Sequence, residues 1–281
     1  MSASLRRAAV LGSPIAHSLS PALHQGAYRA LGLTNWRYDA IECDEGGLAG
    51  LLASLGPEWA GLSLTMPLKR AVLPLLDRID PLAAQVGAAN TVVLAAGQRS
   101  GFNTDVAGIV TAVREAGASF DGNALVLGGG ATACSALAAL RQLGFERATV
   151  AVRSRPRAEP LLAVAGRVGV AVTLTGIGTE LADQSWQLLV STVPAAGAHT
   201  VAGQLAAGRL HAAAVLDVIY DPWPTPLAVA AERAGTPVIS GYEMLLHQAA
   251  AQVELMTGLT APVPAMRAAG LAEIARRRNI R

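Results

Sequence analysis

The sequence predicts an α/β protein of two domains, the second of which carries a doubly wound parallel sheet. Three observations support this prediction. The chain has 281 residues, which is more than one average domain needs and enough for two. Short apolar segments alternate with helical ones, as in parallel sheets that are covered by helices. The pattern changes near residue 107, and a glycine-rich turn follows the next apolar segment.

Strands and helices alternate over the first hundred residues. The apolar run 7–12 ends at Gly12 and fits a buried strand. The segment 20–32 fits a helix with Ser20 as the N-cap, Pro21 as the first helical residue and Gly32 just past its end. The other expected elements are a strand at 36–43, a strand within 61–69 that stops at Pro67, a helix at 68–79 that breaks at Pro74, and a strand followed by a turn at 88–101.

The second part of the chain repeats a strand–helix unit. A helix that ends at Gly117 is followed by a strand, a glycine turn and a helix over 122–144, which Gly144 closes. Further strands are expected at 147–152, 170–174, 188–192, 213–219 and 237–240. A long helix over 244–258 and one last helix finish the chain.

Composition and charge exclude several classes of protein. The net charge is +2 and no long basic cluster occurs, so we expect no nucleic-acid partner. The short basic run 275–279 is interpreted as a solvated tail. No segment approaches the length of a membrane span, and the apolar run near the N-terminus is too short for a signal peptide, so we expect no membrane association.

Cysteine and histidine usage indicates a reducing compartment and no metal site. Cys43 and Cys134 are isolated, which suits a cytoplasmic protein better than a disulfide scaffold. The five histidines lack the spacing of metal ligands. His24 and His247 are interpreted as structural residues of helices.

The glycine turn within 125–133 has the arrangement G-x-G-x-x-A. Gly128 permits a tight turn after the strand, Gly130 lets the backbone approach a pyrophosphate, and a small residue at Ala133 lets helix and strand pack closely. The phosphates would lie at the positive N-terminus of the helix. The predicted Rossmann-type cofactor site also includes Gly129, Ala131 and Thr192. The alternative is an ordinary turn in a chain rich in Ala and Gly.

The next strand ends in Arg153, Ser154 and Arg155, where an NAD-binding domain usually carries an acid. Cationic donors fit the 2′-phosphate of NADP, which an acid would repel. The sequence therefore predicts NADP(H) as the cofactor. A solvated basic loop is the alternative.

Polar residues of the first domain gather where predicted strands end: Ser18, Ser20, Thr65, Lys69, Asn90, Thr91, Asn103 and Asp105. Ligands of open α/β sheets bind outside the carboxyl ends of strands. Hydroxyl and amide groups with one charge pair suit a small polyhydroxy acid.

Seven segments together resemble the successive motifs of the shikimate dehydrogenase family, over about residues 10–258: 13–24, 64–69, 87–91, 101–108, 128–133, 217–227 and 241–249. The resemblance implies reversible, NADP-linked reduction of 3-dehydroshikimate to shikimate, in the biosynthesis of chorismate and aromatic amino acids. It implies a substrate-binding catalytic domain (1–105), a Rossmann NADP-binding domain (106–240) and C-terminal helices (241–281) that pack back on the substrate domain. The expected partner is a small-molecule substrate, bound by a monomer or a homodimer.

The resemblance also implies a role for individual residues. Lys69 and Asp105 match the catalytic pair, and Ser18 and Ser20 match serines that hold the substrate carboxylate. The backbone of Gly241 matches a position that meets the nicotinamide. The positions that contact the carboxylate or ring hydroxyls are Thr65, Asn90, Tyr220 and Gln248.

The chemistry of the catalytic pair supports this assignment. Hydride addition to a ketone leaves an alkoxide, and a lysine can polarise the carbonyl and donate the proton. A carboxylate orients the ammonium and accepts a hydrogen bond from a neighbouring hydroxyl. Asp105 is expected in the first turn of a helix, where the dipole favours its ionised form, with Thr104 as the cap.

The sequence departs from the family pattern at three places, one of which is an extra glycine in the glycine turn where alanine is frequent. Ser63 stands where Asn is usual, and Val152-Arg153-Ser154 replaces Asn-Arg-Thr at the end of the second cofactor strand. The arginine survives, so the NADP prediction stands.

Three alternatives stay open. One is a quinate/shikimate dehydrogenase with relaxed substrate choice or NAD use, against which the basic loop argues. Another is a non-catalytic dinucleotide-binding sensor on the same fold, against which Lys69 and Asp105 argue. The third is a piece of a multifunctional enzyme, although the start at Met1 and the short tail favour a stand-alone chain.

Overall fold

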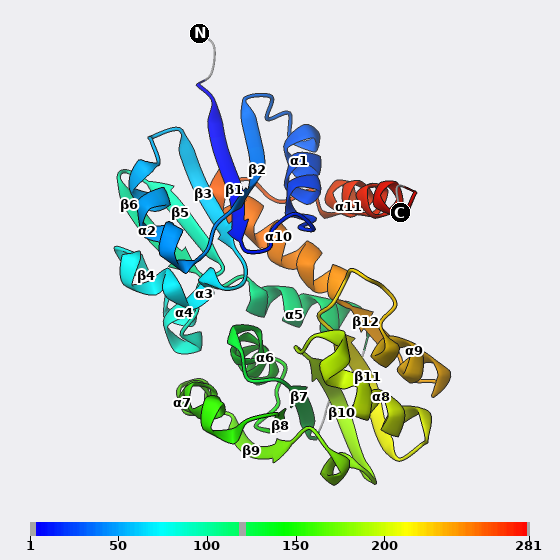
Figure 1. Ribbon diagram of the computed structural model, residues 1–281. Coiled ribbons are helices and arrows are strands. Elements are labelled where there is room, and N and C mark those ends of the chain that lie inside the picture. The colour runs from blue at the N-terminus through cyan, green and yellow to red at the C-terminus, as the bar shows by residue number, and fades with distance from the viewer. Residues whose placement is uncertain (1–3, 118–121, 280–281) are drawn as a thin grey trace. The chain divides into compact units, whose positions relative to one another are not determined.

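The computed structural model describes residues 4–117 and 122–279, which fold into two compact units (Figure 1). Unit 1 comprises Met1–Thr104 and Leu245–Arg281, and unit 2 comprises Asp105–Met244. Each unit contains one six-stranded sheet with helices, so the predicted α/β class is confirmed. The assignment of a substrate role and a cofactor role to the predicted domains stays a prediction.

The sheet of unit 1 is mixed, with the strand order β2-β1-β3-β5-β6-β4. Strand β1 pairs in parallel with β2 and β3, whereas β5 and β6 form an antiparallel hairpin. The hairpin turns at Ala96 and Gly97, both of which have positive φ, as tight hairpins require. The strands are β1 (Arg6–Gly12), β2 (Trp36–Glu42), β3 (Trp59–Leu64), β4 (Arg78–Ile79), β5 (Thr91–Ala95) and β6 (Gln98–Phe102).

The described helices of unit 1 are α1 (Ser20–Ala30), α2 (Glu45–Ser54), α3 (Leu68–Ala71), α4 (Pro81–Val86), the part of α10 (Gly241–Thr257) from Leu245 onward, and α11 (Val263–Arg278), with a short 3-10 helix at Leu73–Leu75. Helices α1 and α11 lie side by side (Figure 1). A Cβ at Gly26 would lie 2.6 Å from the Cβ of Ala269, so glycine allows these helices to approach closely. The C-terminal segment is therefore an integral part of the fold of unit 1.

Several local predictions for unit 1 need correction. Helix α1 begins at Ser20 itself, because Leu19 before it has helical dihedrals, so Ser20 is not the N-cap. Gly32 does follow the helix, with a φ of +68°. The helix expected over 68–79 breaks near Pro74 as predicted, but its last two residues form β4. The turn expected near the end of 88–101 leads into β6, and neither α2 nor α4 was predicted.

The sheet of unit 2 is entirely parallel, with the strand order β12-β11-β10-β7-β8-β9. Counted within the unit, this is the order 6-5-4-1-2-3 of a Rossmann fold, so that prediction is confirmed. The strands are β7 (Ala124–Leu127), β8 (Arg147–Val152), β9 (Ala171–Gly176), β10 (Gln184–Ser191), β11 (Leu210–Asp217) and β12 (Val238–Ser240).

The helices of unit 2 cover both faces of its sheet, with α6 and α7 on one side and α8 and α9 on the other (Figure 1). Leu127 and Val215 of the sheet pack with Val201, Leu205 and Leu227 of α8 and α9 in one buried cluster. The described helices are α5 (Asp105–Glu115), α6 (Ala131–Gln142), α7 (Glu159–Val168), α8 (His199–Ala206) and α9 (Pro226–Arg233), with 3-10 helices at Arg155–Ala158, Thr179–Leu181 and Ala195–Ala198. Among the described residues of the whole chain, every helix is too short or too polar to cross a membrane.

Candidate functional site

A cavity of about 530 Å³ lies at the carboxyl ends of strands β7, β8 and β10 in unit 2. Its volume is in the range of small-molecule sites. Many of the predicted cofactor residues line it, namely Gly128, Gly129, Gly130, Arg153, Ser154 and Thr192. The remaining lining residues are Val152, Ala158, Ile177, Val193 and Pro194. The fold thus gathers residues that follow four strands, β7, β8, β9 and β10, into one site.

Gly128 shapes the turn that leaves strand β7. Its φ is +112°, a backbone conformation that residues with a side chain rarely adopt. Its N–H donates to the Ala151 carbonyl at 2.9 Å. A Cβ at this position would lie 2.5 Å from Oγ1 of Thr192. Thr192 is itself fixed, because its hydroxyl donates to the Leu127 carbonyl at 2.7 Å. Glycine is therefore required here for the backbone geometry.

Gly130 has a different role. It is the N-cap of α6 with an ordinary φ of −82°, and Ala131 is the first helical residue. A Cβ on Gly130 would meet no atom within 4 Å. Open space thus lies before the N-terminus of a helix, whose free N–H groups and dipole favour an anion. This arrangement fits a pyrophosphate group.

The end of strand β8 supplies the cationic side of the cavity. Arg153 is exposed and Ser154 is half-buried, and the described residues that line the cavity include neither Asp nor Glu. A 2′-phosphate would therefore meet a guanidinium donor without a competing carboxylate, so the site fits NADP(H). Arg155, the first residue of a 3-10 helix, is exposed and lies outside the lining of this cavity.

A buried network of amide and hydroxyl groups forms the polar centre of unit 1. The Asn90 Nδ2 donates to Thr104 Oγ1 at 2.9 Å and to Gln248 Oε1 at 3.0 Å. The Asn90 Oδ1 accepts from the Thr104 N–H at 2.7 Å and from the Thr91 hydroxyl at 3.0 Å. The network brings together Asn90 and Gln248, which are 158 residues apart and were both predicted to contact substrate.

The other residues predicted for substrate in unit 1 lie at the ends of secondary structure elements. Ser18 is half-buried and its hydroxyl accepts from the N–H of Ser20, a buried residue, at 3.3 Å. Thr65 is half-buried directly after β3. Lys69 is half-buried in α3, and its carbonyl accepts from the Ala89 N–H at 2.8 Å, which ties it to the segment of Asn90.

The remaining predicted residues belong to unit 2. Asp105 is buried in the first turn of α5. Tyr220 is half-buried after β11. Gly241 begins α10, where a Cβ would collide with the backbone of Val218. Their contributions to one site with Lys69 stay a prediction.

Arg277 of α11 contacts the loop that carries Ser18, and it was not identified from the sequence. Most of the run 275–279 is exposed, as predicted for a solvated segment, but Arg276–Arg278 form the last turn of α11 and Arg277 is half-buried. The guanidinium of Arg277 donates to the carbonyls of His17 at 2.7 Å and Ser18 at 2.9 Å, and it pairs with Glu273 at 2.7 Å. Hydrogen bonds from Arg276 and Arg277 lower the pKa of Glu273 to about 2. Arg277 thus holds the loop that carries Ser18.

His24 is a buried structural residue, and its titration makes the stability of the fold depend on pH. It stacks on Tyr38 with ring centroids 3.9 Å apart, and burial lowers its pKa from 6.5 to about 3. Between these values the unfolded chain binds a proton that the folded chain does not, so stability is lost as pH falls from 6.5 towards 3.

His24→Phe, which keeps a stacking ring, should remove this pH-dependent contribution to stability. Chemical denaturation measures the free energy of unfolding. Between pH 7 and pH 5 this free energy should fall by about 2 kcal/mol more in the parent than in the variant. Equal losses for both proteins would contradict this account.

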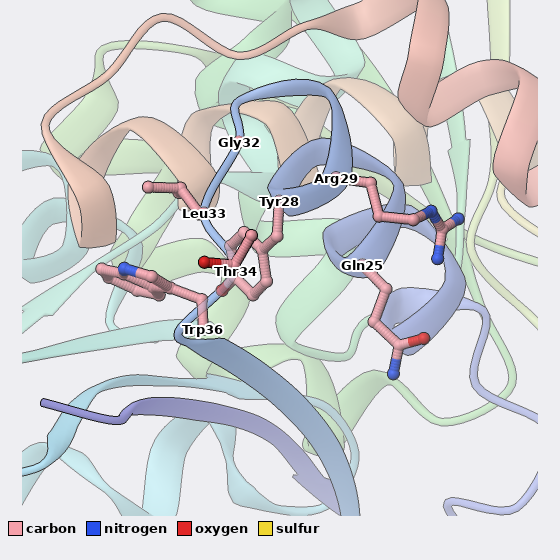
Figure 2. Close-up of a pocket in the computed structure, with 7 residues that line it drawn as sticks. All are labelled: Gln25, Tyr28, Arg29, Gly32, Leu33, Thr34 and Trp36. Atoms are coloured by element: carbon pink, nitrogen blue, oxygen red, sulfur yellow. The ribbon is translucent and has the colours of Figure 1, made fainter. Parts of the chain in front are cut away.

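Another cavity, of about 310 Å³, lies in unit 1 where α1 ends and β2 begins (Figure 2). It is lined by Gln25, Tyr28, Arg29, Gly32, Leu33, Thr34 and Trp36. The rings of Tyr28 and Trp36 pack with their centroids 5.3 Å apart. None of the residues predicted from the sequence to bind substrate or cofactor lines it.

The strand order, the glycine turn and the cavity at the strand ends together define a protein with a Rossmann-type dinucleotide-binding unit. Residues 10–92 match the family model of the shikimate dehydrogenase substrate binding domain, and residues 241–269 match that of the shikimate 5′-dehydrogenase C-terminal domain. The chain belongs to the shikimate dehydrogenase family.

Relatives match along nearly the whole chain. The shikimate dehydrogenase (NADP(+)) of Citrifermentans bemidjiense is 40% identical over 268 residues, which are 91% of each chain. The crystal structure of Mycobacterium tuberculosis shikimate dehydrogenase is 48% identical, with a TM-score of 0.85 over 95% of this chain and 99% of that one. The Thermus thermophilus enzyme in complex with NADP(H) and shikimate is 33% identical, with a TM-score of 0.81 over 95% of this chain and 99% of that one.

Proposed function

We propose that this chain is an NADP-dependent shikimate dehydrogenase, which reversibly reduces 3-dehydroshikimate to shikimate in the biosynthesis of chorismate and aromatic amino acids. The observation that carries the proposal is the cavity of unit 2, which combines a glycine turn with Arg153 and has neither Asp nor Glu among its described lining residues. The similarity to the Thermus thermophilus enzyme with both ligands, over nearly the whole chain, supports the same function.

The residues of unit 2 would hold the cofactor by its phosphates. Gly128, Gly129 and Gly130, with Ala131 at the start of α6, would hold the pyrophosphate, and Arg153 and Ser154 the 2′-phosphate. When bound, NADP(H) supplies or accepts the hydride. Thr192 keeps the glycine turn in shape through its bond to Leu127.

The residues of unit 1 would bind and orient the substrate. Ser18 and Ser20 are suited to a carboxylate because their hydroxyl groups can donate to an anion. Thr65, Asn90 and Gln248, with Tyr220 of unit 2, would contact the carboxylate or ring hydroxyls. Because Asn90 and Gln248 are already hydrogen-bonded to each other, their amides are preorganised for a hydroxylated ring.

The proton in this reaction would move through Lys69. Its ammonium polarises the ketone and donates the proton that the developing alkoxide takes up. In the oxidation direction the neutral amine accepts that proton. Asp105, in the first turn of α5, would orient the ammonium and accept a hydrogen bond from a neighbouring hydroxyl.

Two finer statements belong to the proposal. We expect the enzyme to work in the cytoplasm, in keeping with two buried thiols, Cys43 and Cys134. We expect a monomer or a homodimer.

The test of this function is the reduction of cofactor, followed at 340 nm, with shikimate or quinate against NADP⁺ or NAD⁺. We expect rapid reduction with shikimate and NADP⁺ only. Comparable rates with quinate or NAD⁺ would favour the relaxed relatives. Tight NADP⁺ binding without any reduction would favour a sensor and contradict the proposed roles of Lys69 and Asp105.

A further inference from the structure

We propose that Gln252 is a positioning residue for substrate binding, which acts with Ser63 to hold the segment Asn90–Thr91 in place. The inference rests on the proposed function, because Asn90 is assigned there to the substrate. Gln252 lies in α10, one helical turn after Gln248, and only 1% of its surface is exposed. The hydrogen-bond partners of its side chain, His24, Ser63, Asn90 and Thr91, all belong to unit 1.

The orientation of the Gln252 amide is fixed at both ends. Its Oε1 accepts from the Ser63 hydroxyl at 2.8 Å and lies 3.3 Å from Nε2 of His24. Its Nε2 donates to Thr91 Oγ1 at 3.0 Å and to the Asn90 carbonyl at 3.3 Å. A flipped amide would place its oxygen against the Asn90 carbonyl, which cannot donate, so the observed orientation is favoured.

Thr91 links Gln252 to the side-chain amide of Asn90 through two hydrogen bonds. Because Thr91 Oγ1 accepts from Gln252, its single hydrogen is directed to Asn90 Oδ1, at 3.0 Å. The Asn90 Nδ2 then faces Gln248 Oε1. Gln252 therefore restrains Asn90 twice, through its carbonyl and through the hydroxyl of Thr91.

Ser63 restrains the other end of the arrangement. It lies in β3 with 3% of its surface exposed, and it accepts from the Tyr38 hydroxyl at 2.6 Å. Its own hydrogen is thus directed to Gln252. Where the family pattern has an asparagine, this chain has a shorter serine, and Gln252 completes the buried contact from α10.

Loss of the Gln252 amide should weaken substrate binding more than it slows the chemical step. The Asn90 carbonyl and the Thr91 hydroxyl would lose their buried partner, and Asn90 would no longer be restrained. The hydrogen bonds that fix the Gln252 amide do not involve Lys69, the proposed proton donor. Proton transfer should therefore continue in a variant that lacks this amide. We expect KM for shikimate to rise about tenfold, the factor that one net hydrogen bond represents, with kcat changed less than about threefold.

The experiment compares Gln252→Met, Ser63→Ala and the double variant with the parent enzyme. KM and kcat for shikimate are measured at saturating NADP⁺, and NADP⁺ affinity and thermal unfolding are measured separately. The matched control is Gln204→Met, because Gln204 is a buried glutamine of unit 2 that donates to the Gly178 carbonyl. The control should unfold more easily and keep the parent KM for shikimate. Ser63→Ala should raise KM by a smaller factor, and the double variant should not exceed Gln252→Met, because the two residues act through one contact.

A folded Gln252→Met enzyme with the parent KM, or with kcat reduced as strongly as KM is raised, would overturn the inference. If Gln252→Met does not fold, Ser63→Ala decides, and an unchanged KM in that variant would overturn it. These outcomes leave the proposed function intact. A parent protein that neither binds nor oxidises shikimate would overturn both the function and the inference.

Discussion

Lys69→Arg should lower kcat for shikimate oxidation by about a hundredfold or more, although it keeps the positive charge. The pKa of a guanidinium lies far above neutral pH, so arginine can polarise a carbonyl but cannot accept and return a proton there. Lys69→Ala, which removes the charge as well, should lose still more. Both variants should bind NADP⁺ and unfold like the parent, because Lys69 is only half-buried in a short helix.

The composition of the chain supports this prediction. Of the 22 lysine and arginine residues, Lys69 is the only lysine. Every other basic position uses arginine, so a lysine here indicates a need for the property in which the two residues differ, the release of a proton. Arg29→Ala, which removes an exposed cation from the same unit, is the control and should change kcat less than about twofold. A Lys69→Arg enzyme with near-parental kcat would show that Lys69 is not the proton donor.

Two glycine substitutions in the same turn should have different effects. Gly130→Ala should leave the stability of the protein unchanged, because a Cβ there meets no atom within 4 Å. It should nevertheless weaken NADP⁺ binding by about tenfold or more, because the methyl group occupies space at the N-terminus of α6 that the pyrophosphate needs. Calorimetric titration with NADP⁺ and thermal unfolding measure the two effects.

Gly128→Ala should instead destabilise the fold. Its φ of +112° is strained for alanine, and the new Cβ would lie 2.5 Å from Thr192 Oγ1. We expect a loss of about 1–3 kcal/mol in the free energy of unfolding, with weaker NADP⁺ binding as a consequence. If Gly130→Ala destabilised the protein as much as Gly128→Ala, or bound NADP⁺ like the parent, the assignment of the turn would be wrong.

The sequence predicted unit 2 better than unit 1, for a physical reason. Parallel strands buried on both faces are continuous apolar runs, and β8 was predicted at its observed bounds. In unit 1, β6 is the polar segment Gln98–Phe102, whose strand pairing comes from the hairpin with β5. Serine is a common N-cap residue, which is why Ser20 was predicted to precede the helix. Leu19 has helical dihedrals, so it takes the N-cap position and Ser20 is the first residue of α1.

The same distinction applies to the site. The glycine turn and Arg153 were predicted as cofactor residues because each belongs to a pattern of residues that are adjacent in the sequence. Gln252 and Arg277 have no such signal, because their partners lie far away in the sequence. Gln252 reaches Ser63 across 189 residues, and Arg277 reaches Ser18 across 259. The fact that Lys69 is the only lysine was visible in the sequence, and it is the local sign that singles out this residue.

The most direct test of the central claim is the stoichiometry of the reductive reaction. Purified protein is mixed with 3-dehydroshikimate and NADPH, the loss of absorbance at 340 nm is followed, and the product is separated and quantified. The account predicts that one shikimate forms for each NADPH consumed. Tight binding of NADPH with no consumption, or consumption without formation of shikimate, would contradict it.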